Sequence, residues 1–96
     1  MSADILPDDF RALDAPLTID RGGAGAPLEL AVVSIDPLPP HRLRAAPFSL
    51  ILRGPRTPLL AQATYAVRHP RRGMIEIFLV PIGQDADGAR YEVTFN

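Results

Sequence analysis

Proline and glycine interrupt this 96-residue chain so often that long helices are excluded. The chain has 11 Pro and 7 Gly, and neither residue is tolerated well inside a helix. The pieces between them are short and apolar, and several alternate apolar with polar residues. Because successive side chains of a strand point to opposite faces, this period of two predicts half-buried β-strands. Six strands are predicted, over residues 17–20, 28–35, 48–53, 63–68, 75–80 and 91–96.

Six short strands in a chain of this length predict an all-β fold, a small antiparallel six-stranded barrel or sandwich. The third segment shows the pattern clearly, because Phe48, Leu50 and Leu52 share one face. In the second segment the alternation slips at Val32 and Val33. This slip indicates either a β-bulge or burial on both faces.

The length allows a single β domain that spans all 96 residues. Within it, we expect residues 1–16 to form an N-terminal arm and residues 17–96 to form the β core. A short helix is predicted in the arm between Pro7 and Leu13, where acidic side chains follow the proline. Phe10 lies three residues before Leu13, so both side chains can face one way and plug an open end of the barrel.

Several function classes are excluded by residues that the chain lacks. It has no Cys, so disulfides, thiolate nucleophiles and sulfur-ligated zinc are excluded. It has no Lys, so Schiff-base chemistry and a P-loop lysine are excluded as well. A formal net charge of −1 argues against a nucleic-acid partner, which usually requires a basic excess.

The sequence predicts neither a membrane partner nor a targeting segment. No apolar run approaches the roughly 20 residues that a membrane helix needs. The start, Met1-Ser2-Ala3-Asp4, has no basic flank and no apolar stretch behind it, so no signal peptide is expected. The final location stays open, and an extracellular or virion-like assembly is compatible with it.

Charge is distributed unevenly along the chain. Residues 1–40 carry seven acids and two Arg, and residues 41–96 carry four acids and eight Arg. If the last four strands form a simple meander, one end of the barrel collects these basic groups: His41, Arg42, Arg44, Arg68, His69, Arg71 and Arg72. The opposite end then receives Arg53, Arg56, Asp85 and Asp87. A sandwich in which residues 37–40 cross between sheets would scatter both sets.

No arrangement of side chains predicts catalysis, a cofactor or a metal. The segment Asp85–Gly88 resembles the start of a calcium loop, but Asn96 stands where the glutamate ligand is required. We therefore expect a plain hairpin turn there. His41 and His69 lack the spacing that fixes metal ligands on one element, and no serine lies in a nucleophile elbow. The chain is accordingly expected not to be an enzyme.

Apolar side chains that point away from the core give the most useful indication of function. In a closed barrel Ile51, Phe78 and Val80 point outward, and such groups on a small domain favour a partner surface. Arg71 and Arg72 would add a charged rim. Two alternatives stay open: a sandwich whose strands are covered on both faces, for example by the N-terminal arm, and an arginine pair that is simply solvated.

The second half of the chain carries an ordered set of motifs. They are Phe48-Ser49-Leu50, Arg53-Gly54-Pro55, Leu60, Gln62, Tyr65, His69-Pro70, Gly73, Phe78-Leu79-Val80-Pro81, Gly83, Tyr91-Glu92 and Phe95-Asn96. This pattern resembles a family of small bacterial proteins classed only as a domain of unknown function. Three positions depart from it: Asp14 and Ala63, where glycine is usual, and Arg72, where an apolar residue is usual. The resemblance implies no catalytic activity and an association with phage-tail-like or tail-collar proteins.

We therefore expect a non-catalytic structural or assembly protein that acts through protein–protein contacts, in a phage-tail-like or surface-fibre system. Self-association is also expected, because a small core gains stability from shared burial. The alternative function is a small-molecule or glycan binding module at the mouth of the barrel. That alternative requires a pocket lined by Tyr65, Tyr91 or Phe95.

Overall fold

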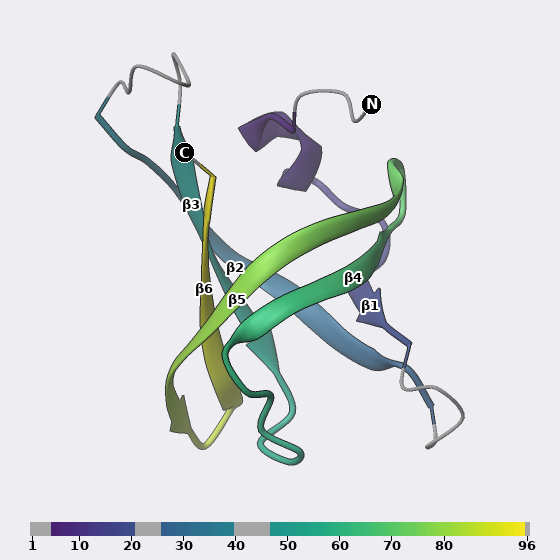
Figure 1. Cartoon of the computed structure of the whole chain (residues 1–96), viewed down its shortest axis with the longest axis vertical. Coiled ribbons are helices and arrows are strands. Elements are labelled where there is room, and N and C mark those ends of the chain that lie inside the picture. Colours follow the sequence, from purple (N-terminus) through teal and green to yellow (C-terminus); the bar gives the residue numbers. More distant parts are fainter. Residues whose placement is uncertain (1–4, 21–25, 40–46, 96) are drawn as a thin grey trace.

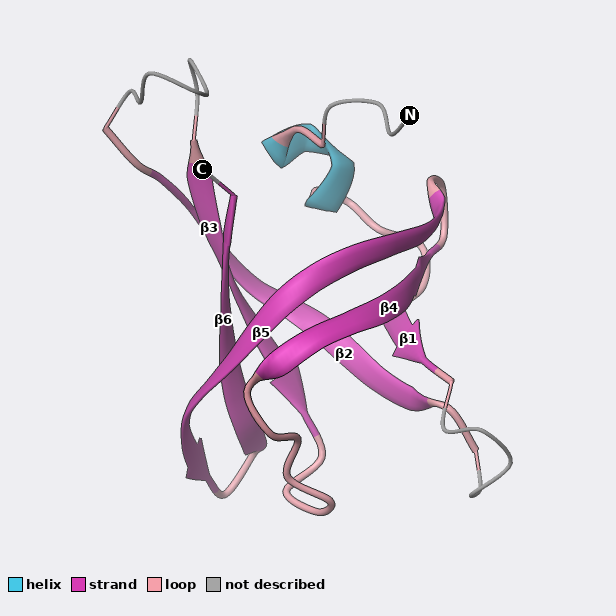
Figure 2. Cartoon of the chain, viewed as in Figure 1, coloured by secondary structure: helices cyan, strands magenta, loops and turns pink. Residues whose placement is uncertain are grey.

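The computed structural model describes residues 5–20, 26–39 and 47–95. All six predicted strands are present, and they form a closed antiparallel barrel with a short helical turn at one end (Figures 1 and 2). The elements are η1 (Pro7–Phe10), β1 (Leu17–Ile19), β2 (Leu28–Pro37), β3 (Phe48–Gly54), β4 (Ala63–His69), β5 (Gly73–Asp85) and β6 (Gly88–Phe95). The all-β prediction is confirmed, and of its two forms the barrel is the one adopted.

The strands follow one another around the barrel in the order β1-β2-β3-β6-β5-β4. The prediction of a simple meander from β3 to β6 is wrong, because β3 pairs with β6 from Phe48 to Gly54 and not with β4. The physical reason is the connection 55–62, which carries the chain away from β3 so that β4 lies beside β1. A hydrogen bond of 3.0 Å from the Leu60 N–H to the buried Tyr91 hydroxyl fastens this connection to β6.

β5 is the longest strand because it serves both halves of the barrel. Its residues 73–79 pair with β4, and its residues 80–85 pair with β6. The register shifts once in β2, around Val33, and once in β5, around Ile82. Such β-bulges bend and twist a strand, which helps short strands close into a barrel. The bulge predicted from the broken alternation at Val32 and Val33 is confirmed.

Apolar side chains from all six strands fill the interior of the barrel. The following of them are at most 2% exposed: Leu17, Leu30, Phe48, Leu50, Leu52, Val67, Ile77, Leu79, Tyr91 and Val93. Within each strand they stand at alternate positions, as the period of two predicted. The barrel therefore has one packed core, to which Ile19, Leu28 and Ala89 also belong.

The N-terminal arm closes one end of this core. Its helix is shorter than predicted, a single 3-10 turn that ends at Phe10. The Phe10 side chain is buried and lies against the rings of Phe48, His69 and Phe95, with centroid distances of 6.1, 5.3 and 5.6 Å. Leu13 packs against the same core. The predicted plug of Phe10 and Leu13 is thus present, with Phe10 as its buried part.

Although the strand order differs from a meander, β4 and β6 still run opposite to β3 and β5, so the two ends of the barrel stay separate. Figure 1 shows η1 at the same end as the start of β3, the end of β6 and the β4–β5 turn. Arg68, His69, Arg71 and Arg72 belong to that turn and its approach. The predicted companions His41, Arg42 and Arg44 lie outside the described residues. In the part of the chain that the structure describes, no helix has the length and apolar character to cross a membrane.

Candidate functional site

Three of the predicted interface residues lie on the outer surface of β3 and β5. Ile51 of β3 and Val80 of β5 both stand opposite Glu92 of β6, one on each side of it. Phe78 lies two residues before Val80, so it shares the same face of β5. We call these four residues the outer face. Because neighbouring strands are about 4.8 Å apart, Ile51 and Val80 lie roughly 10 Å from one another across Glu92.

The outer face combines one prominent aromatic side chain with a partly covered apolar base. Phe78 is 49% exposed, whereas Ile51, Val80 and Glu92 are half-buried. The N-terminal arm packs with its aromatic side chain against the end of the barrel. The structure thus brings Ile51, Phe78 and Val80 onto the outside of one barrel wall.

The two arginines predicted as a charged rim instead contact the arm. The Arg71 guanidinium donates hydrogen bonds to the backbone carbonyl oxygens of Asp8 and Asp9 at 3.0 Å and of Arg11 at 3.2 Å. Arg72 forms an ion pair with Asp9, with 3.6 Å between guanidinium nitrogen and carboxylate oxygen. Both side chains therefore make contacts within the same chain. The sequence predicted either a partner contact or a solvated pair, and neither alternative included the arm.

His69 completes the contacts between the β4–β5 turn and the arm. It is 2% exposed, and its Nδ1 accepts hydrogen bonds from the backbone N–H groups of Arg71 and Arg72 at 3.0 and 3.1 Å. An accepting Nδ1 assigns the proton to Nε2, which therefore donates to the Asp9 carbonyl oxygen at 2.6 Å. Both ring nitrogens are engaged, so this arrangement leaves neither for a metal ion.

The predicted hairpin turn at Asp85–Gly88 joins β5 to β6. The Asp85 carboxylate accepts a hydrogen bond from the Asp87 N–H at 2.8 Å and pairs with Arg90 at 3.2 Å. The hydrogen bond from the Asp87 N–H has the largest effect and lowers the pKa of Asp85 below its ordinary value of 3.8. Desolvation opposes it, and the charge of Arg90 adds a further, smaller lowering. The turn therefore holds a carboxylate in its charged form.

This lowered pKa predicts how acid affects the turn. A carboxyl group whose pKa is lowered by folding contributes stability above its ordinary pKa, and that contribution is lost as pH falls through the folded value. We expect Asp85→Asn to lower the melting temperature at pH 7, with a smaller difference from the wild type at pH 3. Asp87→Asn is the matched control, because Asp87 contributes its backbone N–H to this contact. A difference for Asp85→Asn that stays constant between the two pH values would contradict the assignment.

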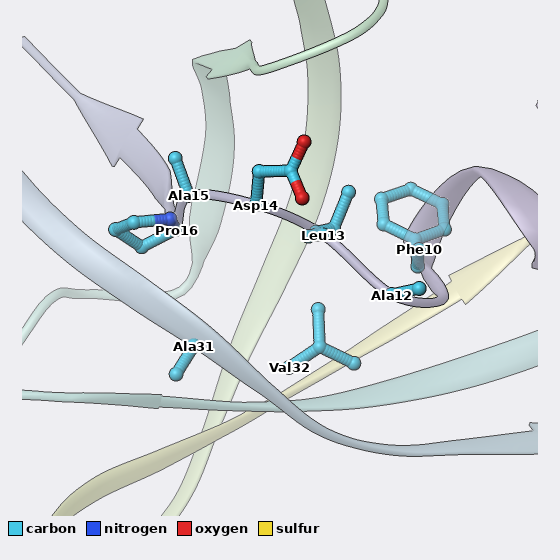
Figure 3. Close-up of a pocket in the computed structure, with 8 residues that line it drawn as sticks. All are labelled: Phe10, Ala12, Leu13, Asp14, Ala15, Pro16, Ala31 and Val32. Carbon is cyan, nitrogen blue, oxygen red and sulfur yellow. The ribbon is translucent and has the colours of Figure 1, made fainter.

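The surface of the described residues has several open hollows, and one of about 440 Å³ includes the charged residues Glu29, Arg53 and Asp87 in its wall. Another of about 380 Å³ lies between the arm and β2, and its wall is formed by Phe10, Ala12, Leu13, Asp14, Ala15, Pro16, Ala31 and Val32. Figure 3 shows the arm from Ala12 to Pro16 along one side of this hollow, with Ala31 and Val32 opposite. Among the described residues that line this hollow, Asp14 is the one with an ionisable side chain. This composition gives no acid–base pair.

The aromatic residues proposed for a ligand pocket at the barrel mouth have internal roles. Tyr91 is 1% exposed and accepts the hydrogen bond from Leu60. The Tyr65 hydroxyl donates to the Ala61 carbonyl oxygen at 2.7 Å. Phe95 stacks on Phe48, with ring centroids 4.7 Å apart. Within the described residues, no group of three or more His, Asp or Glu side chains is placed to hold a metal ion.

Fold and surface together define a small six-stranded antiparallel β-barrel with a filled interior, an arm across one end and an apolar outer face. The chain belongs to the family described as domain of unknown function DUF6916, whose family model matches residues 7–95. Comparison with curated proteins and with solved structures gives no significant match. The resemblance to an uncharacterised domain family is thereby confirmed, and the match includes the arm from Pro7 onward.

Proposed function

We propose that this protein is a non-catalytic assembly component that binds another polypeptide through its outer face. The observation that carries the proposal is the exposed Phe78 ring beside the half-buried pair Ile51 and Val80. An aromatic anchor on an apolar base is the kind of surface on which protein contacts concentrate their binding energy. Glu92, between the two strands that carry Ile51 and Val80, adds one charge to orient the partner.

The partner that we propose is a component of a phage-tail-like or surface-fibre assembly, or a second copy of this chain. The first part rests on the family resemblance, and the second on the small size of the core. Arg71 and Arg72 are not included in the proposed interface, because both contact the arm. A ligand pocket at the barrel mouth is not favoured, because Tyr91 and Phe95 are used in internal packing.

The test compares two baits that differ at one exposed apolar position. The wild type and Phe78→Asp are used for affinity capture from the native host, followed by mass spectrometry, and for light scattering at high concentration. Loss of a buried aromatic anchor weakens an interface by about 30-fold, so we expect Phe78→Asp to lose the partner. Leu59→Asp is the matched control, because Leu59 is 51% exposed but lies in the connection 55–62.

A tail or fibre component retained by the wild type and by Leu59→Asp, but not by Phe78→Asp, would support the proposal. A wild type that stays strictly monomeric and retains nothing specific would contradict it. Equal retention by Phe78→Asp and the wild type would place the interface elsewhere and would also contradict it.

A further inference from the structure

Hydrogen bonds, an ion pair and ring contacts that hold the N-terminal arm connect two distant parts of the sequence. On one side is the arm segment 7–11, and on the other are the barrel end and the β4–β5 turn. The barrel side consists of Phe48, His69, Arg71, Arg72 and Phe95. We call these five residues the arm site. Because the arm segment is continuous and short, the arm site has the form of a peptide-binding site occupied by the chain's own arm.

The arm site recognises its occupant mainly through main-chain groups. Arg71 and His69 donate to three carbonyl oxygens, those of Asp8, Asp9 and Arg11. Two side chains add specificity: the Phe10 ring enters the aromatic end of the barrel, and the Asp9 carboxylate pairs with Arg72. The ligand class is therefore a tight turn that contains an acidic residue followed by an aromatic one.

The link between the arm and the barrel, residues 12–16, has a backbone conformation that makes it unfavourable for the arm to dock on its own barrel. Ala12 has φ of +52°, and it is the one described residue other than glycine with a positive φ. Residues other than glycine disfavour this left-handed region, because their Cβ atom comes too close to the backbone. Arg11 before it is extended, with φ −94° and ψ 144°, and Ala12, Asp14 and Ala15 are exposed. The sharp turn at Ala12 is thus strained, and Leu13 is the residue of this link that packs against the core.

We infer that the arm site also accepts the arm of a second copy, so that two chains exchange their N-terminal arms. The same contacts form in the exchanged state, because each arm still meets an identical arm site. The gain is the relief of Ala12, which can then become extended. Strain in a short hinge of this kind favours exchange. A second copy is the occupant that the structure supports, because its segment 7–11 is already shown to fit.

The length of the link restricts the geometry of the exchanged pair. Five residues from Ala12 to Pro16 span at most about 17 Å when extended, which is less than the 25 Å of the shortest dimension of the molecule. The two barrels must therefore meet at their arm ends and exchange arms reciprocally. This arrangement is a closed two-fold dimer, not an open chain of copies. It leaves the outer face free, so it is independent of the proposed function.

Two substitutions at Ala12 test the inference in opposite directions. Proline cannot adopt the observed φ, but an extended residue such as Arg11 tolerates a proline after it. Ala12→Pro therefore opposes the turn back and should strengthen dimerisation by about tenfold or more. Ala12→Gly removes the strain and should weaken dimerisation by a similar factor. Sedimentation equilibrium over a concentration series measures both, with Phe78→Asp as a control that leaves the arm site intact.

Cross-linking identifies the contact itself, and it uses the absence of Cys from the chain. One copy carries Asp9→Cys and another, with a mass tag, carries Arg72→Cys. After mixing, a short bis-maleimide can join these two positions only if an arm docks on the other copy. We expect a cross-linked pair of mixed mass on a denaturing gel, and none when the arm copy also carries Phe10→Ala.

Each outcome decides the inference. A stronger dimer with Ala12→Pro, a weaker one with Ala12→Gly and a mixed cross-link would support arm exchange. A monomeric Ala12→Pro, or a mixed pair that never cross-links, would overturn it. If Ala12→Pro does not fold, the cross-link between otherwise unaltered arms still decides. Loss of the dimer with Phe78→Asp alone would point to the outer face and would contradict arm exchange.

Discussion

Gly88→Ala is expected to destabilise the barrel by about 3–6 kcal/mol, a large part of the total stability of a domain of this size. Two effects combine at this position. Gly88 has φ of +137°, a conformation open in practice only to glycine. A Cβ atom built on Gly88 would also overlap the backbone carbonyl oxygen of Gly54. Because the obstacle is backbone and not a flexible side chain, the strands themselves would have to move apart.

Gly73→Ala separates these two effects. Gly73 also has a positive φ, of +73°, but a Cβ there meets nothing within 4 Å. Gly73→Ala should therefore lose only the free energy that the strained backbone conformation costs, about 1–2 kcal/mol. Denaturant unfolding of the two variants gives the comparison. Equal losses for Gly73→Ala and Gly88→Ala would show that the close approach to Gly54 carries no energy, against this prediction.

The contact between Gly88 and Gly54 explains how the barrel closes at the end opposite the arm. Gly54 is the last residue of β3 and pairs with Ala89 of β6. A Cβ on Gly54 would itself lie 2.8 Å from the Leu30 side chain. The end of β3 thus lies so close to the β5–β6 turn and to Leu30 of β2 that neither Gly54 nor Gly88 has room for a side chain. Small residues at this corner allow β3 to pair with β6.

Local sequence patterns were sufficient to predict the strands, because alternation is a property of each segment alone. The pattern at Phe48, Leu50 and Leu52 predicted both the strand and its buried face. It could not predict the neighbour of that strand, because period-two alternation says which face is buried and not which strand lies alongside. The pairing of β3 with β6 depends on the course of the connection 55–62 and on the space around Gly54.

The arm site was not predictable in the same way. His69 and Arg71 act on carbonyl oxygens more than fifty residues away in the sequence, and every residue carries a carbonyl, so the acceptors leave no trace in the sequence. The usable signal was the apolar pair Phe10 and Leu13, which predicted a plug. Similarly, the positions of Ile51 and Val80 on the outside followed from alternation. Their common neighbour, Glu92, required the register of β6.

Phe10→Ala is the second change expected to have a large effect, a loss of about 3–5 kcal/mol. The ring is buried against Phe48, His69 and Phe95, so its removal leaves a cavity at the end of the core. The main-chain hydrogen bonds of the arm remain chemically possible. They should nevertheless open more often, because the ring is the largest apolar contact that holds this segment in place. Denaturant unfolding and hydrogen exchange of residues 5–16 measure the two consequences.

Leu6→Ala is the matched control for Phe10→Ala, because it removes a large apolar side chain from the same arm at a position that is 51% exposed. We expect it to change the free energy of unfolding by no more than about 0.5 kcal/mol. If both variants lost the same free energy of unfolding, the buried Phe10 ring would stabilise the protein no more than the exposed Leu6 side chain does, against this prediction. If instead Phe10→Ala lost stability while the arm kept its protection, Arg71 and His69 would be sufficient to hold the arm, and recognition would rest on main-chain groups alone.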